Sequence, residues 1–107
     1  MYNLIALVGR LVSTPIKEET ESGTHTKITL AVPRSFKNME GIYETDFIDC
    51  VLYNVIADRT CEYCQKGNIV GVKGRLQTRI IETEDTKKRI MELVAEKLTF
   101  LSSKKED

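Results

Sequence analysis

A segment near the middle of the chain, residues 66–81, carries basic side chains and no acid. Its basic residues are Lys66, Lys73, Arg75 and Arg79. The acids gather elsewhere, mainly at residues 17–21, 40–49 and 82–85, so a net charge of zero hides a segregated distribution. A basic stretch of this kind can neutralise the phosphates of a nucleic acid. The balanced total of 16 basic and 16 acidic residues argues the other way, because nucleic-acid binders usually carry a basic excess.

The same segment contains a Gly-x-x-Gly sequence, Gly71 to Gly74, with a lysine inside it. KH domains use such a loop, placed between two helices, to hold a nucleic-acid backbone. Here apolar and polar residues alternate instead. One of the two alternating sets contains Val70, Val72, Leu76 and Ile80, with Gly74 among them. The other parity holds Lys73, Arg75, Gln77 and Arg79. This period of two predicts a strand with apolar side chains inward and cations outward, whose glycines mark places where a barrel strand bends or bulges.

A second candidate surface lies in residues 45–54. Ile48, Cys50 and Leu52 form the expected inward set. The opposite parity holds Phe47, Asp49, Val51 and Tyr53. Outward aromatic rings beside outward cations are typical of proteins that hold single-stranded nucleic acid, because bases stack on the rings for about 1–3 kcal/mol each while the cations follow the phosphates. A loop or another subunit could also cover these rings.

The cysteines indicate no metal or redox site. Cys61 and Cys64 form a C-x-x-C sequence, but only Cys50 and His25 remain to complete the four ligands of a structural zinc site. We therefore expect buried, reduced cysteines, with Cys61 and Cys64 on one face of a helix. His25 is expected at a turn or a strand edge.

No catalytic constellation stands out either, since the sequence holds no nucleophile elbow, no Walker lysine loop and no histidine-based triad. Asp46 and Asp49 could mimic the carboxylate pair of a nuclease, without further support. The N-terminus lacks the features of a signal peptide, and no apolar run approaches the roughly 20 residues of a membrane helix. We predict a non-enzymatic protein without cofactor or metal, located in the cytoplasm and associated with the nucleoid.

The elements that must position these side chains follow from the alternation of apolar runs and polar turns. Strands are expected at residues 2–11, 27–36, 45–54, 68–79 and 89–101, and a helix at 55–65 that Gly67 ends. Local propensity favours a helix at 89–101, and only the global order favours a strand there. Five strands with one helix between the third and the fourth are the order of an OB-fold barrel, an all-β fold. We expect one such domain over residues 1–101 and a short polar tail over 102–107.

Several of these stretches resemble bacterial single-stranded DNA-binding proteins. They are NLIALVGRL, ITLAVPRSFKN, DFIDCVLYN, YCQKGNIVGVKGRLQTR and ELVAEKLTFL, in register over residues 2–101. The resemblance implies an OB-fold that assembles as a homotetramer and binds single-stranded DNA without strong sequence preference, in DNA replication, recombination, repair or uptake. Most members continue into a linker with an acidic tip that recruits replication proteins. The present chain resembles the short, tailless forms of Gram-positive bacteria, for which such recruitment is not expected.

The resemblance also implies roles for single residues. Phe36, Phe47 and Tyr53 fall on stacking aromatics of the family, whereas Ile81 replaces a fourth and removes one platform. Lys66 and Arg79 fall on positions where the family often places cations. Weaker assignments are Arg10, Arg34, Lys37, Lys73 and Arg75. With Gln77 from the outward parity, the expected DNA-binding set is Arg10, Arg34, Phe36, Lys37, Phe47, Tyr53, Lys66, Lys73, Arg75, Gln77 and Arg79.

Two other binding modules remain open at this point. One is a primosomal OB-fold adaptor, usually a dimer. The other is a protein-interaction OB domain with weak DNA binding, which the zero net charge and Ile81 would suit.

Overall fold

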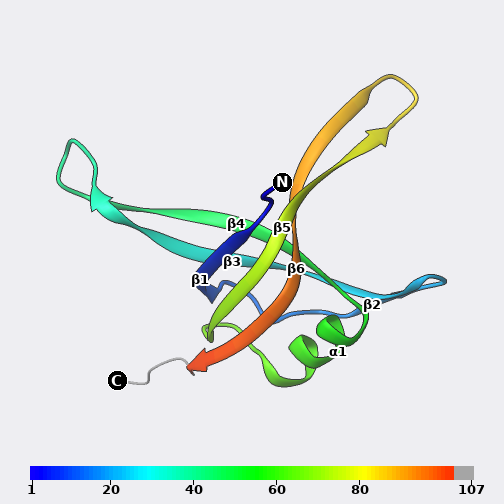
Figure 1. Ribbon diagram of the computed structural model, residues 1–107, viewed down its shortest axis with the longest axis horizontal. Helices are drawn as coiled ribbons and strands as arrows, with labels where there is room; N and C mark the ends of the chain where they lie inside the picture. Colours follow the sequence, from blue (N-terminus) through cyan, green and yellow to red (C-terminus); the bar gives the residue numbers. More distant parts are fainter. Residues whose placement is uncertain (103–107) are drawn as a thin grey trace.

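The computed structural model of this protein describes residues 1–102 and contains a single mixed sheet with one helix (Figure 1). The strands are β1 (Ile5–Leu11), β2 (Glu18–Thr20), β3 (Gly23–Lys37), β4 (Tyr43–Tyr53), β5 (Ile69–Glu82) and β6 (Lys87–Ser102). The helix α1 (Asn54–Tyr63) connects β4 to β5. Ser102, expected in the polar tail, is the last residue of β6, and the rest of that tail, 103–107, lies outside the described residues.

The sheet closes into a barrel. Its order is β1-β5-β6-β4-β3-β2, and β1 also pairs with β3, so five strands form a closed surface while β2 lies at one edge. All neighbours are antiparallel except β4 and β6, which meet in parallel at Cys50↔Leu93 and Val51↔Val94. With α1 between the third and fourth barrel strands, this topology is the OB-fold and confirms the predicted all-β fold.

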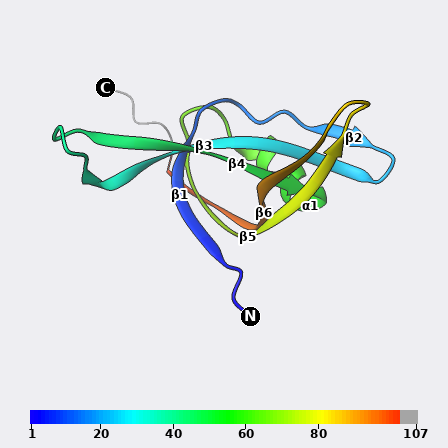
Figure 2. The same ribbon diagram turned by 90° about the horizontal axis from the view of Figure 1, so that it is seen from above.

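Two long hairpins project from the barrel, one formed by β3 and β4 and the other by β5 and β6 (Figures 1 and 2). Residues 89–101, ambiguous in sequence, are strand because β6 pairs with β5 along its length, from Ile69↔Ser102 to Glu82↔Lys87. The short β2 escaped prediction because its three residues are all exposed and show no apolar pattern.

The barrel interior is filled by the side chains that point inward from each strand. Its buried side chains include Leu11, Ile28, Leu30, Cys50, Leu52, Val70, Val72 and Leu93. The helix covers one end with Ala57, Thr60 and Cys64, spaced at i, i+3 and i+7 on one stripe. Cys61, expected on this buried face, is only half-buried at its edge. The three cysteines are free, and residues 1–102 contain no cluster of potential metal ligands.

Three side chains depart from the predicted parity. Leu76 and Ile80, expected inward, are 40% and 59% exposed because β5 has left the barrel there and runs in a two-stranded ribbon with no core beneath it. Val51, expected outward, is only 7% exposed because it lies at the floor of a groove where β6 meets β4.

The Gly-x-x-Gly lies inside β5, so a KH loop is excluded. The register of β5 against β6 shifts between Lys73 and Gly74, and a Cβ added at Gly74 would lie 2.1 Å from the carbonyl oxygen of Val94. Gly74 therefore permits the close strand approach at the bulge, as predicted. At Gly71 an added Cβ would meet its nearest atom at 3.6 Å, and the β5–β6 register does not shift there, so this glycine marks no bulge.

Among residues 1–102, no helix is long and apolar enough to cross a membrane.

Candidate nucleic-acid interface

Three aromatic rings of the expected DNA-binding set are exposed on β3 and β4. Phe47 is 68% and Tyr53 is 44% exposed, and their even spacing along β4 gives them the same parity. Phe36, near the end of β3, is 66% exposed. Within the described part of the chain, no loop covers these rings, so they are available to a ligand on the single subunit.

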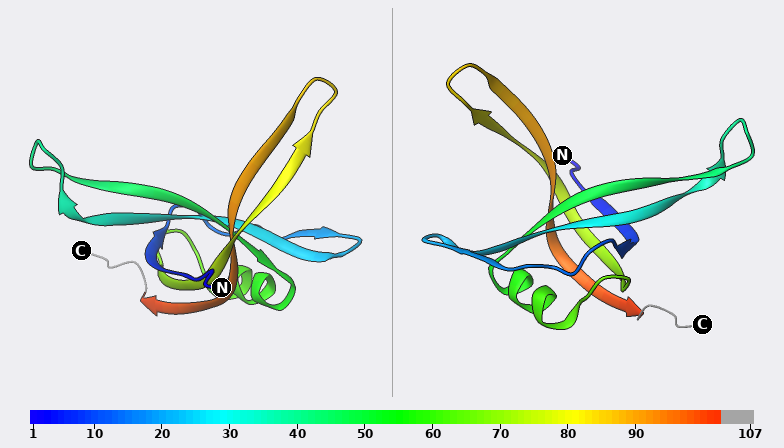
Figure 3. Two further views of the ribbon diagram at one scale, coloured as in Figure 1. Left: turned by 45° about the horizontal axis from the view of Figure 1, so that its top comes forward. Right: turned by 180° about the vertical axis from the view of Figure 1, so that it is seen from behind.

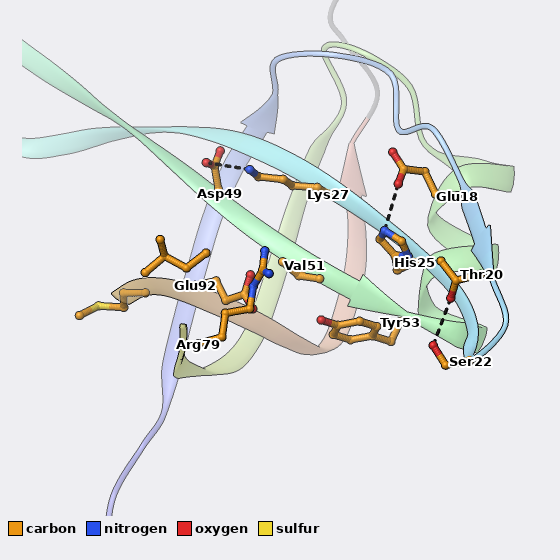
Figure 4. Close-up of a pocket in the computed structure, with 12 residues that line it drawn as sticks. Glu18, Thr20, Ser22, His25, Lys27, Asp49, Val51, Tyr53, Arg79 and Glu92 are labelled. Carbon is orange, nitrogen blue, oxygen red and sulfur yellow. Dashed lines mark hydrogen bonds and ion pairs between the residues drawn. The ribbon is translucent and has the colours of Figure 1, made fainter. Parts of the chain in front are cut away.

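Tyr53 lies in a groove of about 600 Å³ between the β3–β4 face and the β5–β6 ribbon (Figure 4). Phe47 lies in an adjoining hollow of about 500 Å³. The groove and the hollow share Asp49, Met91 and Glu92 as walls, so they form one continuous depression across β4 and the base of the ribbon. We call this depression the β4 groove.

Each basic side chain that lines the Tyr53 end of the β4 groove has a carboxylate partner. The pairs are Arg79 Nε with Glu92 Oε1 at 3.1 Å, Lys27 Nζ with Asp49 Oδ2 at 3.7 Å, and His25 Nε2 with Glu18 Oε2 at 3.1 Å. Glu92 is only 9% exposed, whereas Arg79 is 56% exposed. A phosphate that enters the groove must therefore compete with resident carboxylates, which is how a chain with zero net charge can still present cations there.

His25 was missed as a groove residue. It lies opposite Tyr53 in the β3–β4 register, and the two ring centroids are 6.4 Å apart with planes tilted by 42°. Sequence reasoning had placed His25 only at a turn or strand edge. The only signal that could have found it is the strand register, which sequence alone does not supply.

The β3–β4 hairpin holds Arg34 between two acids. Its guanidinium donates from Nε to Asp46 Oδ2 at 3.1 Å and from Nη2 to Asp46 Oδ1 at 2.9 Å, and it also pairs with Glu44. This hydrogen bonding lowers the pKa of Asp46 and raises the pKa of Arg34. The Asp46 carboxylate is thus occupied by Arg34. Because Asp46 and Asp49 are three residues apart, their carboxylates lie on opposite faces of β4 and form no nuclease-like pair.

The remaining expected cations do not all gather at the β4 groove. Lys73 lines a separate hollow with β1 and the last part of β6, and Arg10 lines another between β1 and β3. Strand twist explains the separation, because Lys73 and Arg79 share a parity but lie six residues apart on a coiled strand. Arg10 also donates to the Gly67 carbonyl oxygen at 3.0 Å. The cations that parity placed together are thus split between two sides of the barrel.

The other polar members of the set lie outside the groove. Arg75 donates to Gln77 Oε1 at 2.6 Å, and its Nε is 3.7 Å from Glu96. Lys37 lies 5.6 Å from the centroid of the Tyr43 ring, a cation–π contact on the β3–β4 hairpin. Lys66 is exposed after α1, in the turn that precedes β5.

Known proteins share sequence similarity with this chain over nearly its whole length. A sequence model of the Single-strand binding protein family matches residues 2–101. The chain is 42% identical to the single-stranded DNA-binding protein B of Bacillus subtilis over 106 residues, covering 97% of this chain and 94% of that protein. It is 43% identical to the single-stranded DNA-binding protein 3 of Listeria innocua, of which it spans 66% while 97% of this chain is covered.

A solved structure shares the fold. The Plasmodium falciparum SSB in complex with ssDNA superimposes with a TM-score of 0.82 and is 28% identical, covering 95% of this chain and 96% of that chain. The family match extends over nearly the whole OB-fold that the strands build. This chain therefore belongs to the single-strand binding protein family.

Proposed function

We propose that this protein binds single-stranded DNA without strong sequence preference and acts as a binding module, not as an enzyme. Bases stack on Phe36, Phe47 and Tyr53, and phosphates meet the cations beside them. The observation that carries the proposal is the β4 groove, in which the exposed ring of Tyr53 lies with Arg79 and the exposed ring of Phe47 lies in the adjoining hollow. The family match and the ssDNA in the Plasmodium falciparum complex support the same ligand.

The roles of the cations follow from their surroundings. Arg79 is the groove cation best placed to reach a phosphate, because more than half of its side chain is exposed beside Tyr53. Lys66 and Lys73 are exposed and make no ion pair among residues 1–102, so they add phosphate contacts where the strand leaves the groove. Arg34 contributes least, because two acids already occupy its guanidinium.

The protein acts in DNA replication, recombination, repair or DNA uptake in the cytoplasm, as a homotetramer that coats exposed strands. The resemblance to bacterial family members supports this assembly. Leu4, just before β1, and Val8, within β1, are 63% and 57% exposed and give the single chain an apolar surface suited to a subunit contact.

Titration with oligo-dT tests the proposal. The chain has four tyrosines and no tryptophan, so tyrosine fluorescence reports on wild-type binding, and anisotropy of a labelled oligo-dT reports on the variants. We expect tight binding that weakens as salt rises. Phe47→Ala and Tyr53→Ala should each lose about 1–3 kcal/mol, because each removes one stacking platform. Tyr63→Ala, an equally exposed ring on α1, is the matched control and should bind normally.

Absence of oligo-dT binding at low salt refutes the proposal. It would favour a protein-interaction OB domain, an alternative supported by the pairing of Arg79 and Lys27 with carboxylates in the β4 groove. Native mass addresses the remaining alternative, because a dimer would fit a primosomal adaptor and a tetramer would not.

A further inference from the structure

A second groove lies between α1 and the last part of β6 and includes none of the residues proposed to contact DNA. Its volume is about 430 Å³. Its apolar lining is made by Val55, Ile56, Tyr63, Leu98 and Phe100. The helix closes the end of the barrel opposite the tip of the β5–β6 hairpin (Figures 1 and 3). We call this depression the α1–β6 groove.

Several apolar side chains that line the α1–β6 groove are exposed to solvent. Val55 is 65%, Tyr63 is 68% and Phe100 is 46% exposed, although all three are large and mainly apolar. They come from both sides of the groove, since Val55 and Tyr63 lie at the two ends of α1 and Phe100 lies on β6. Adjacent exposed apolar side chains of this size commonly mark a site of interaction with another molecule.

The charges around the α1–β6 groove differ from those of the β4 groove. Arg59 and Lys97 line it, both are exposed, and neither has an ion-pair partner among residues 1–102. The acid on this side, Glu96, lies 3.7 Å from the guanidinium of Arg75 and is already engaged there. An incoming carboxylate would therefore meet two unpaired cations and one occupied acid.

We propose that the α1–β6 groove binds a short acidic peptide segment of another protein. An apolar side chain of the peptide packs against Ile56, Leu98 and Phe100, and flanking carboxylates pair with Arg59 and Lys97. A DNA strand suits this groove less well, because aliphatic side chains such as Val55 and Leu98 offer no stacking platform and nucleic-acid interfaces are more polar.

The α1–β6 groove lies apart from the stacking rings, and it meets the proposed phosphate contacts only where Lys97 pairs with Lys73 in the β5–β6 register. Phe47 and Tyr53 lie along β4 beside the base of the β5–β6 ribbon, whereas the peptide would lie under α1 at the closed end of the barrel. The surface thus provides a way to hold a partner protein on a DNA-coating subunit.

Anisotropy of a labelled peptide in which aspartate alternates with leucine tests the site on the intact chain. We expect saturable binding that salt weakens. The double variant Arg59→Glu, Lys97→Glu should lower affinity at least about tenfold, because it places two repulsive charges at the rim. Tyr63→Ala should also weaken the peptide while leaving oligo-dT affinity unchanged. Lys88→Glu, an exposed reversal on the β5–β6 hairpin, is the matched control and should bind the peptide normally.

Two control peptides separate the contributions of charge and apolar contact. A peptide with serine in place of each leucine should not bind. A peptide with asparagine in place of each aspartate should not bind either. No anisotropy change up to millimolar protein, or equal losses in the Lys88→Glu control, overturns the proposal. So does full displacement of the peptide by oligo-dT, with weaker oligo-dT binding by the Arg59→Glu, Lys97→Glu variant, because the groove would then be a DNA surface. A lower native mass of that variant also overturns it, because the groove would then be a subunit contact.

Discussion

Under the proposed function, Glu92 competes with phosphate for Arg79 in the β4 groove, so removing its charge should strengthen DNA binding. In the free protein, Arg79 Nε donates to Glu92 Oε1 at 3.1 Å. The substitution Glu92→Gln keeps the shape of the side chain and an oxygen that can accept this hydrogen bond. It removes the charge that holds the guanidinium away from a ligand, so Arg79 can turn to a phosphate at lower cost.

The size of the effect follows from the exposure of the pair. Two unit charges about 4 Å apart attract by about 1 kcal/mol in water and about 4 kcal/mol at an effective dielectric constant of 20. Measured exposed pairs retain only about 0.2–1 kcal/mol. Because Glu92 is 9% exposed and Arg79 is 56% exposed, we expect the upper end of that range, about 1 kcal/mol, or roughly a fivefold gain in affinity for oligo-dT.

Salt dependence supplies a second readout. Each phosphate contact with a single strand contributes about −0.7 to the slope of log affinity against log salt. In the wild type, phosphate binding frees Glu92 from Arg79, and the freed carboxylate takes up a cation from solution. This uptake offsets part of the release of counterions from the DNA. Glu92→Gln should therefore steepen the slope by up to about 0.7 for each Arg79 that meets a phosphate. Anisotropy of labelled oligo-dT at four salt concentrations measures both quantities.

Two variants decide whether the gain acts through Arg79. In an Arg79→Gln background, Glu92→Gln should give a smaller gain than in the wild type, since no guanidinium remains to be released and only the repulsion between Glu92 and phosphate is removed. Glu62→Gln, an exposed carboxylate on α1 outside the groove, controls for the general loss of a negative charge. Equal gains from Glu92→Gln and Glu62→Gln, or no change in affinity and slope, would refute the reasoning.

Three further predictions concern the fold and the missing aromatic. Gly74→Ala should destabilise the protein by about 1–3 kcal/mol, because the new Cβ would lie 2.1 Å from the Val94 carbonyl oxygen. The loss should appear as a lower Tm at fixed protein concentration. Gly71→Ala is the control and should leave Tm nearly unchanged. Ile81→Phe should raise oligo-dT affinity by restoring a ring at a position that is 38% exposed, and no gain would show that the strand does not reach it. Burial raises the pKa of the Cys50 thiol from 9.0 to about 11, so the stability this thiol contributes is complete below pH 9 and is lost as pH rises toward 11. By pH 10 the loss is about 1 kcal/mol, and urea unfolding at pH 8 and pH 10 should show a smaller drop for Cys50→Ala than for the wild type.

The barrel and the exposure of the Phe47 and Tyr53 rings follow from patterns within single segments of the chain. Alternation along a strand is a local property, so the parity of residues 45–54 placed Phe47 and Tyr53 outward without knowledge of their neighbours. The same alternation put Ile28, Leu30, Val70 and Val72 in the core. The order of strands and helix then selected the OB-fold, which also resolved the helix propensity of residues 89–101 in favour of a strand.

The surroundings of each charged side chain depend on how the strands pack together. The ion pairs of Arg79 with Glu92 and of Lys27 with Asp49 join residues on different strands, and they depend on register that no local pattern encodes. Twist and the extension of β5 beyond the barrel likewise separated Lys73 from Arg79 and exposed Leu76. A strand pattern specifies which side of a sheet a residue occupies, whereas the partners it meets there depend on how distant segments pack.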